Sequence, residues 1–598
     1  MRTFGDASAR TFTFGGRVLG LTGAVASEHY LSAQAGMDMY GAGGNAFDAA
    51  AAAALAESVV NAHMFSLGGE CPLLARPARP DGQGRVYSVN GNTKAPAKAT
   101  LSAFTSRGLS LIPPRGVIAS GVPAALDAIL TMLERWGSLP FEVVAEPARR
   151  LARDGFPVHE GLFSMPNYGL ADNTERFAVE WPASAALYLT PEGSPKPVGT
   201  PLKNPALAAL FDALIEAAKR AGDPKTGCRA ARDFFHRGEP AAAIGRFSKE
   251  RDGLLARADV EAFETLVEAP VSIRFRGASV YKCGPWSQGP VFLQLLRILD
   301  NFDLAGMGHN SADSLHLWLE AAKLAYADRE QYYADPALAD VPMAGLLSRE
   351  YGAARARLID MQRASPDLRP GDPRKGAALL PEEQIIARGP WGPGTVHVAA
   401  ADKWGNLAAL TPSGGWITGN EIVPELGFAL TTRLQTFYLD PRHPNAPAPG
   451  KRPRTTLSPS LAFFEGGAGA DGAAPWEMAF GTMGGDQQDQ WTSQFFLNRL
   501  IFGMLPQEAI EAPKITSDHF PGTFHPHDAA PGRAKAEGRI DREVLRELER
   551  RGHEIIVEGD WSAGFICAAS RDGRGVLEAA ADPRGAVAKV FPATALAR

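Results

Sequence analysis

Cysteine is scarce in this chain, with four residues among 598, at positions 71, 228, 283 and 567. Their number and wide spacing argue against a disulfide framework and against a cysteine metal site. No apolar stretch reaches transmembrane length. Residues 1–20 carry four charged side chains and no apolar run, which argues against a signal peptide. We therefore expect a protein without a membrane span, located in the cytoplasm.

Strong charge of either sign is also lacking. The formal net charge is -5 and the isoelectric point is near 6.2, so no basic surface for nucleic acid or membrane is expected. With 45% apolar and 21% charged residues, the composition is that of an ordinary globular protein. Length alone gives an expectation of about two to four domains.

Several catalytic and cofactor motifs are absent. The sequence contains no phosphate-binding loop, no His-Glu-x-x-His, no Gly-x-Ser-x-Gly and no internal repeat. Asp518, His519, His525 and His527 are the one candidate metal cluster, but the prolines among them favour a solvated loop. We expect neither a metal nor a cofactor.

The chain does have a clear hairpin pattern between residues 392 and 416. Apolar and other residues alternate over residues 396–401, which predicts a strand. Lys403, Trp404 and Gly405 form a three-residue loop of the common hairpin type, with glycine at the position of positive φ. A second strand would return from residue 407.

The register of this hairpin brings hydroxyl groups together. If Asp402 pairs with Asn406, Ser413 lies opposite Thr395 and Thr411 lies opposite His397, close enough for hydrogen bonds. A cut before Thr395 would free an α-amine that titrates at about pH 8 and can act as base for the adjacent hydroxyl. From this stretch alone, a buried hairpin whose threonines bond to backbone is the favoured interpretation.

A second stretch changes that balance. Gly484 and Gly485 precede a probable helix through residues 491–497, and paired glycines there leave backbone N–H groups free to face an oxyanion. The two stretches together resemble the γ-glutamyltransferase family of N-terminal-nucleophile hydrolases. The features that carry the resemblance, which spans nearly the whole chain, are residues 395–397 with 402–406, residues 451–459, the Gly484-Gly485 pair and residues 43–50.

The resemblance implies an α+β fold, a four-layer αββα sandwich. The precursor would cut itself before Thr395 into a large portion, residues 1–394, and a small portion, residues 395–598, intertwined as one globular unit. No nucleic acid or membrane partner is implied. The partners would be a small amide or peptide substrate and the two chains themselves, with a homo-oligomer left open. Most bacterial relatives are exported, so a cytoplasmic location would depart from the family habit.

The resemblance also assigns roles. Thr395 would attack an amide carbonyl and form an acyl-enzyme, which water hydrolyses or an amine captures. Ser413 would bond the nucleophile. The remaining assignments are Thr411 and His397 as supporting residues, Gly484 and Gly485 as the oxyanion hole, and Thr455 and Thr456 as contacts to the substrate α-carboxylate.

Other positions depart from the family pattern at the substrate clamp. Asn92 stands where an arginine normally holds the α-carboxylate, and Thr436 stands where an acidic residue normally holds the α-ammonium. Charge-assisted bonds of this kind are worth roughly 1.5–3 kcal/mol each. Arg433 replaces a glutamine, and Gly415 replaces an asparagine. Two residues that an alignment slip could hide as substitutes are Arg454 and Glu425.

Arg433 leaves two interpretations open. Pointing inward, it would favour an anionic acyl group without an α-amine. Otherwise it points to solvent or pairs with an acidic neighbour such as Asp440. Glu70 stands where relatives usually carry glycine, and its carboxylate must be paired or lie near solvent. Whether this carboxylate lines the active site or lies outside it is left open.

Three functional hypotheses follow. The preferred one is a self-processing amidohydrolase or acyltransferase of this family with a non-standard acyl substrate. The second is an ordinary γ-glutamyltransferase or glutathione hydrolase. The third is an uncut, non-catalytic family member that serves as a binding protein.

The pattern also predicts elements elsewhere. Helices are expected over residues 41–61 with Asn45 as N-cap, 126–136, 142–152 with Gly155 as stop, from 285 through 298, 309–328 and 541–551. Residues 555–557 are predicted as the final strand. Residues 364–394, rich in Pro, Gly, Arg and Glu, are predicted as a surface linker that tolerates a chain break.

Overall fold

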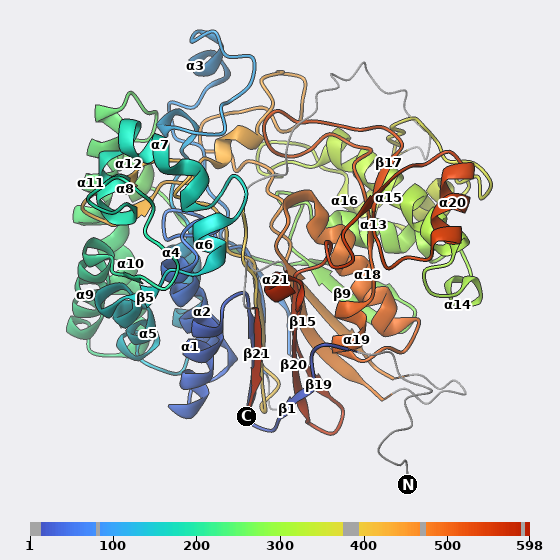
Figure 1. The fold of residues 1–598 in the computed structure, drawn as a ribbon, viewed down its shortest axis with the longest axis horizontal. Coiled ribbons are helices and arrows are strands. Elements are labelled where there is room, and N and C mark those ends of the chain that lie inside the picture. Colours follow the sequence, from blue (N-terminus) through green and yellow to red (C-terminus); the bar gives the residue numbers. More distant parts are fainter. Residues whose placement is uncertain (1–12, 79–83, 375–393, 467–473, 588–592) are drawn as a thin grey trace.

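The computed structural model describes residues 13–598 apart from 79–83, 375–393, 467–473 and 588–592. Two antiparallel sheets of seven strands each form the centre of the molecule (Figure 1). In spatial order, the first sheet contains β21 (Thr594–Ala597), β2 (Gly23–Ser27), β10 (Val398–Asp402), β11 (Leu407–Leu410), β3 (Leu73–Arg76), β4 (Tyr87–Asn90) and β7 (Leu266–Glu268). The second contains β1 (Val18–Gly20), β20 (Leu577–Ala581), β19 (Ile566–Asp572), β15 (Trp476–Thr482), β14 (Ser460–Phe464), β9 (Ala278–Lys282) and β8 (Val271–Phe275).

The two sheets pack face to face through small side chains. Successive residues of a strand point to opposite faces. In β10, Ala399 and Ala401 accordingly belong to the core between the sheets, whereas Val398 and Ala400 belong to the core beneath the helices. Ala409 and Ala479 extend the alanine layer across β11 and β15. The alanines of this stretch therefore line both faces of a buried strand.

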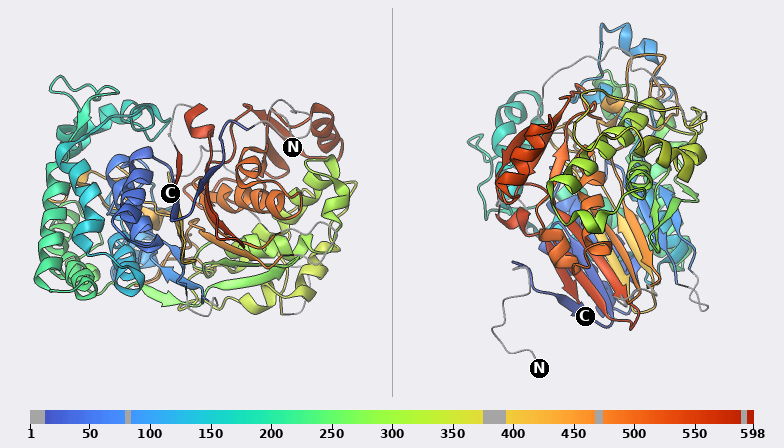
Figure 2. Two further views of the ribbon diagram at one scale, coloured as in Figure 1. Left: turned by 90° about the horizontal axis from the view of Figure 1, so that it is seen from below. Right: turned by 90° about the vertical axis from the view of Figure 1, so that its right-hand side faces the viewer.

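Helices cover the outer face of the first sheet (Figure 2). α1 (Tyr30–Gly41) and α2 (Ala46–Val60) lie directly on it, and the alanine run of α2 is fully buried. The Asn45 side chain caps α2 in a reciprocal capping box with Asp48. The predicted N-cap is thus confirmed, while the helix begins five residues after Gly41. Outside these two lie α4 (Ala125–Trp136), α5 (Phe141–Asp154), α9 (Pro205–Arg220) and α10 (Pro224–Arg237).

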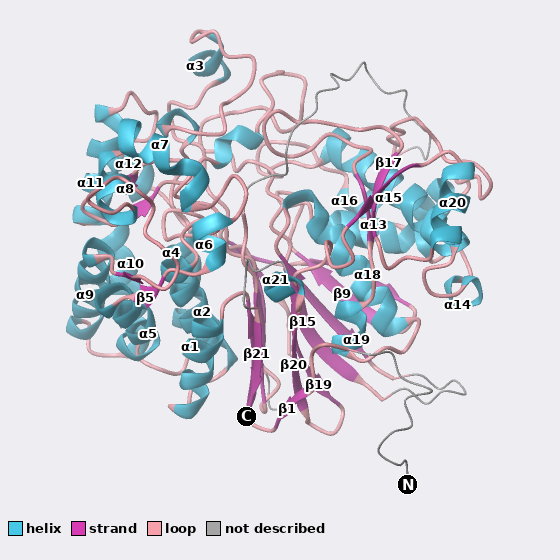
Figure 3. Cartoon of the chain, viewed as in Figure 1, coloured by secondary structure: helices cyan, strands magenta, loops and turns pink. Residues whose placement is uncertain are grey.

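The second sheet carries its own helical layer, shown with the other elements in Figure 3. α13 (Pro290–Leu299), α15 (Ala312–Tyr332) and α18 (Gln488–Leu500) enclose its core, with α20 (Arg542–Arg550) further out. The remaining elements are α3 (Leu101–Thr105), α6 (Glu160–Ser164), α7 (Leu170–Glu180), α8 (Pro182–Tyr188), α11 (Glu239–Glu250), α12 (Arg257–Glu261), α14 (Leu304–Met307), α16 (Met343–Leu346), α17 (Arg349–Ala356), α19 (Pro506–Glu511), α21 (Arg584–Val587), η1 (Val117–Ala119), η2 (Arg433–Thr436), η3 (Gly485–Gln487), β5 (Phe156–Pro157), β6 (Pro201–Leu202), β12 (Ile422–Val423), β13 (Phe428–Ala429), β16 (Ile515–Ser517), β17 (Arg533–Glu537) and β18 (Glu554–Glu558).

The prediction that the chain ends with the strand at residues 555–557 is wrong. That segment is β18, in a small sheet with β16 and β17, and β19, β20 and β21 follow it. The later strands were missed because they are rich in alanine, which has weak strand propensity. β19 and β20 are stabilised by burial between layers, and β21 by pairing with β2 at the edge of the first sheet.

The predicted α+β, four-layer αββα class is the observed one. Each sheet takes strands from both sides of Thr395: β2, β3, β4 and β7 precede it in the first sheet, and β1, β8 and β9 precede it in the second. No helix in the described ranges is both long and apolar enough to cross a membrane.

Candidate active site

The hairpin of β10 and β11 has the predicted register. Val398 lies opposite Leu410, and an isolated bridge continues the pairing to Thr395 and Ser413. Gly405, in the loop, has φ of 89°. Turn chemistry therefore fixes which hydroxyl faces Thr395.

Two hydrogen bonds cross this end of the hairpin. Thr395 Oγ1 lies 3.2 Å from Ser413 Oγ, and His397 Nδ1 lies 3.0 Å from Thr411 Oγ1. All four residues are buried. Burial, with a smaller contribution from the Lys282 cation, lowers the pKa of His397 to about 3. His397 is therefore neutral near pH 7 and acts through hydrogen bonding.

The carbonyl group of Gly394, just before Thr395, is held by two donors. Ser413 Oγ donates to its oxygen at 2.8 Å, and Trp416 Nε1 donates to it at 2.7 Å. The same indole N–H also lies 2.9 Å from the oxygen of Met64. Sequence reasoning missed Trp416, since its approach depends on Gly414 and Gly415, whose φ of 82° and 65° turn the chain back toward Gly394.

Arg433 points into the site and is paired. Its Nε donates to Glu70 Oε1, and its Nη2 donates to Ser413 Oγ at 2.8 Å. Both charged side chains are fully buried. Burial raises the pKa of Glu70, opposed by the Arg433 cation, and burial lowers the pKa of Arg433, opposed by Glu70. The acidic neighbour is therefore Glu70, whereas Asp440 pairs with Arg442 at 2.9 Å.

Arg433 also lies between two aromatic rings and keeps one free donor. Its guanidinium carbon is 4.9 Å from the Trp416 ring centroid and 5.2 Å from that of Phe524. Nη1 is buried and has no hydrogen-bond partner in the described part of the chain. A buried donor of this kind needs an acceptor, which a bound substrate could supply.

The predicted oxyanion glycines form the turn from β15 to α18. Gly484 and Gly485 have φ of 109° and 58°. A Cβ on Gly484 would lie 2.4 Å from the Trp491 ring, while one on Gly485 would lie 3.4 Å from the Phe524 ring. Phe524 also packs on Arg433, which donates to Ser413. The glycine turn therefore lies on the same side of the site as Arg433 and Ser413.

Polar side chains hold this turn from behind. Gln288 Nε2 donates to the oxygen of Gly485 at 3.2 Å, and Arg329 Nη1 donates to Gln288 Oε1 at 3.0 Å. Arg329 also pairs with Asp486, which accepts from the backbone N–H of Thr523 at 2.9 Å. None of these supporting residues was predicted. Gln288, Arg329 and Thr523 are distant in sequence from the turn, and the position of Asp486 directly after Gly485 does not indicate its partners.

Of the predicted substrate-binding residues, Asn92 lies near Thr455 and Thr456, whereas Thr436 lies beside Arg433. Asn92 Nδ2 donates to the oxygen of Pro453 at 2.7 Å, next to the segment with Thr455 and Thr456. Thr456 Oγ1 is buried and has no partner among the described residues. The Thr436 hydroxyl instead donates to the backbone oxygen of Arg433 at 3.0 Å. Neither Asn92 nor Thr436 supplies a charge.

The two candidate substitutes for the missing clamp are engaged elsewhere. Arg454 Nη2 pairs with Glu330 at 2.9 Å, and both side chains are largely buried. The Glu425 side chain is 54% exposed and lies 3.5 Å from Arg246. Glu70 is therefore the acidic residue that the structure places beside Ser413.

The histidine cluster is not the solvated surface that its prolines suggested. His519 and His527 are buried, and His519 Nδ1 accepts from the N–H of Gly532 at 2.9 Å. In the described ranges no group of three ligand side chains could hold a metal ion. The prediction of exposure was wrong because segments distant in sequence cover these side chains: His519 Nε2 lies 3.1 Å from the backbone oxygen of Asp367, and the His527 ring stacks on Tyr438.

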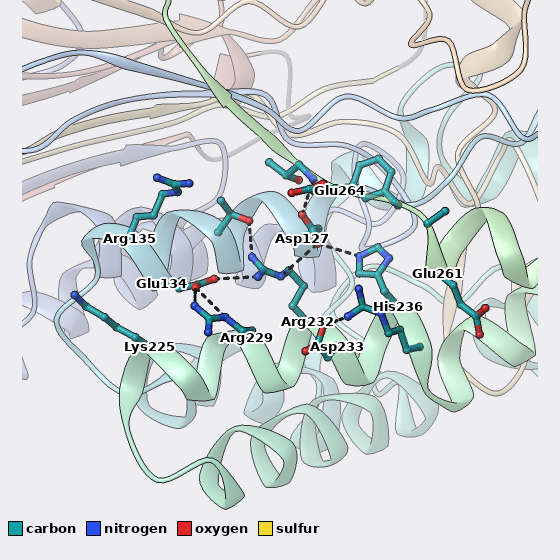
Figure 4. A pocket seen from close by; sticks show the side chains of 15 residues that line it. Asp127, Glu134, Arg135, Lys225, Arg229, Arg232, Asp233, His236, Glu261 and Glu264 are labelled. Atoms are coloured by element: carbon teal, nitrogen blue, oxygen red, sulfur yellow. Dashed lines mark hydrogen bonds and ion pairs between the residues drawn. The ribbon is translucent and has the colours of Figure 1, made fainter.

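A separate polar pocket lies between α4 and α10 (Figure 4). Arg232 lies between Asp127 and Glu134 there, 3.7 Å and 3.0 Å from their carboxylates, and His236 is 3.4 Å from Asp127. These groups pair with one another and contain no activated nucleophile. The hairpin site remains the candidate for chemistry.

Comparison with known proteins agrees with this arrangement. A model of the gamma-glutamyltranspeptidase family matches residues 32–591. The glutathione hydrolase-like YwrD proenzyme of Bacillus subtilis (strain 168) is 30% identical over 572 residues, covering 95% of this chain and 98% of its own. The solved structure of LmbA2991HD has a TM-score of 0.90 at 40% identity, covering 98% of this chain and all of its own. Cephalosporin acylase from Bacillus halodurans has a TM-score of 0.81 at 28% identity, covering 100% and 99%. The predicted sandwich fold is confirmed.

Proposed function

This chain belongs to the gamma-glutamyltranspeptidase family, and from that premise we propose that it cuts itself before Thr395 and acts on an amide whose acyl group lacks a free α-ammonium. At the level of the family it is an amide hydrolase or acyltransferase. The bond cut in processing is the peptide bond between Gly394 and Thr395. The products are residues 1–394 and 395–598, which stay associated through shared sheets.

The proposed chemistry uses the freed Thr395 as nucleophile. Its α-amine accepts the hydroxyl proton, and Oγ1 attacks the substrate carbonyl to form an acyl-enzyme. The N–H groups of Gly484 and Gly485 stabilise the developing oxyanion. Ser413 orients Oγ1, and the neutral His397 orients Thr411 beside it.

The observation that carries the substrate proposal is the buried Arg433–Glu70 pair at Ser413. Arg433 Nε donates to Glu70 Oε1 and neutralises that carboxylate. Glu70 Oε2 is buried without a partner among the described residues, but the pair as a whole offers an ammonium no net negative charge. Removing the substrate ammonium from water without a charged partner costs at least about 1–3 kcal/mol of binding free energy. Because Glu70 neutralises Arg433, the free Nη1 offers a hydrogen bond to an acyl oxygen and only a weak preference for an anion.

An ordinary γ-glutamyl substrate is the second candidate. The observation that favours it is Glu70 itself, since an acidic and a basic group at one site could divide to hold an α-ammonium and an α-carboxylate. The unpartnered Glu70 Oε2 and Arg433 Nη1 are the atoms that would hold those two groups, with the ion pair left in place. Because the two charges already offset each other, each would hold its substrate group more weakly than a free charge would.

Processing and substrate choice are tested separately. Mass spectrometry of the purified chain should find two chains, the smaller beginning at Thr395, and Thr395→Ala should remain one chain. An uncut wild type that still hydrolyses amides, or a cut elsewhere, would contradict the nucleophile assignment.

Substrate choice is then measured as kcat/KM for the glutaryl, γ-glutamyl and butyryl anilides. We expect kcat/KM for the glutaryl anilide to equal or exceed that for the γ-glutamyl anilide. Arg433→Gln should reduce any difference in kcat/KM between the glutaryl and butyryl anilides. A γ-glutamyl preference of about a hundredfold or more, nearly 3 kcal/mol, would establish the ordinary transferase instead.

A further inference from the structure

A second catalytic arrangement surrounds the Gly394 carbonyl, which must be attacked when the chain cuts itself. Its oxygen is 2.8 Å from Ser413 Oγ and 2.7 Å from Trp416 Nε1. We propose that these two donors form the oxyanion site of self-cleavage, distinct from the glycine pair that serves amide substrates. The proposal rests on the proposed function, because it assigns residues to the cut before Thr395.

Chemistry alone fixes the direction of each hydrogen bond at Ser413. A serine hydroxyl has one hydrogen and two lone pairs. The Gly394 oxygen can only accept and the Arg433 guanidinium can only donate, so Ser413 gives its hydrogen to Gly394 and accepts from Nη2 at 2.8 Å. One lone pair remains for the Thr395 hydroxyl at 3.2 Å. The Thr395 hydrogen therefore faces Ser413, and both lone pairs of its oxygen are free to attack.

This order defines a balanced proton transfer. As Thr395 Oγ1 bonds to the Gly394 carbon, its proton passes to Ser413 Oγ, and the Ser413 proton passes to the Gly394 oxygen. The carbonyl double bond becomes a C–OH single bond. On collapse, the C=O re-forms, the C–N bond breaks, and the hydroxyl proton goes to the nitrogen of Thr395. Water then hydrolyses the resulting ester, which leaves the Gly394 carboxylate and restores the Thr395 hydroxyl.

Trp416 is suited to stabilise the transition state more than the ground state. Before attack, its N–H is divided between the oxygens of Gly394 and Met64, at 2.7 and 2.9 Å. As Thr395 Oγ1 bonds to the carbon, negative charge grows on the Gly394 oxygen until the Ser413 proton arrives. During that interval the oxygen is a stronger acceptor, and the shared hydrogen bond shifts toward it. An interaction that strengthens along the reaction lowers the barrier. The buried indole, at 2% exposure, excludes water from this bond.

Arg433 is a positioning residue in this reaction. It contacts neither the attacking oxygen nor the carbonyl group, and acts through Ser413 Oγ. Its Nη2 occupies the lone pair that would otherwise let Ser413 turn its hydrogen away from Gly394. Lysine can supply a similar donor, whereas glutamine offers a weaker, uncharged one. Arg433→Lys should therefore cut faster than Arg433→Gln.

The test follows the self-cleavage of full-length chains made by cell-free synthesis, with the uncut fraction measured on denaturing gels over time. The variants are Trp416→Phe, Ser413→Ala and a chain carrying the sulfur isostere benzothienylalanine at position 416, which keeps the ring shape and lacks the N–H. Trp318→Phe is the matched control, because the buried Trp318 indole of α15 donates to Ser493 Oγ of α18 at 3.3 Å, outside the site. Folding is compared by thermal unfolding in a Thr395→Ala background, where no variant is cut.

We expect the isostere and Trp416→Phe to slow the cut by about 10²-fold, the usual effect of losing an oxyanion donor, and Trp318→Phe to cut at the wild-type rate. An isostere chain that folds and cuts as fast as wild type would overturn the assignment. If Trp416→Phe does not fold, the isostere decides. A wild-type chain that is never cut would instead contradict the proposed function, so the two failures are distinguishable.

Discussion

Gly484→Ala is the sharpest perturbation of the turn proposed to bind the substrate oxyanion. The added Cβ would lie 2.4 Å from Trp491 Cζ3 and 2.9 Å from Cη2. The ring belongs to α18 and is 1% exposed, so it cannot move aside freely. Carbon atoms prefer about 3.5–4 Å, so the turn must shift by about 1 Å.

That shift sets the expected magnitude. A misplacement of about 1 Å can cost 10²-fold in rate, and the full loss of one oxyanion donor costs about 10²–10³. We therefore expect acylation by Gly484→Ala to fall by about 10²-fold or more. Gly485→Ala should fall less, because its Cβ meets Phe524 at 3.4 Å and the remaining cost is the strain at φ of 58°, about 1–2 kcal/mol. The bulkier, β-branched Gly485→Val should approach the larger loss.

The assay is the single-turnover release of aniline from an anilide substrate, measured on cut enzyme. Gly503→Ala is the control for backbone strain alone, because its φ is 65° and nothing lies within 4 Å of its Cβ. Gly484→Ala should still cut itself, because a different pair of donors holds the Gly394 oxygen. A folded Gly484→Ala enzyme with wild-type acylation would remove this turn from the site.

Two further predictions concern stability. Asp489→Asn should lower the unfolding free energy by about 3–5 kcal/mol. It removes the carboxylate 2.9 Å from the buried Lys282 ammonium, which then has only the neutral oxygens of Ser458 and Ser460 beside it. Thermal unfolding checks this, and the double variant Lys282→Met with Asp489→Leu should recover part of the loss. Burial lowers the pKa of His397, His443 and His519 to about 3, so the unfolded chain binds more protons between about pH 6.5 and 3. Each of these histidines should therefore lower the free energy of unfolding by up to about 1.4 kcal/mol for each pH unit as pH falls through that window. His519→Gln removes one such histidine, so its melting temperature should fall less steeply with decreasing pH than that of the wild type. An unchanged slope would contradict the burial of His519.

The sequence was most informative where local chemistry decides the structure. The three-residue loop at Gly405 fixed the hairpin register, and with it the pairing of Thr395 with Ser413. Glu70 and Arg433 could not be paired in advance, because nothing in either segment indicates that they meet. Trp416 was missed for a related reason, since its approach to Gly394 depends on positive φ at two consecutive glycines. The strands β19 and β20 were missed because alanine marks close packing between layers without marking a strand.

The position of Thr395 within the sheet has a consequence for the chemistry of the cut. Thr395 lies three residues before β10, which is paired on one side with β2 and on the other with β11. The proposed cleavage would create a new amino terminus three residues from a central strand and bridged to Ser413. Thr395 would thus gain its amine with little of the conformational freedom of a free end. The chain would have to fold before the cut, because the two pieces would afterwards have no covalent link. Reassembly after unfolding would then be a bimolecular encounter that depends on protein concentration.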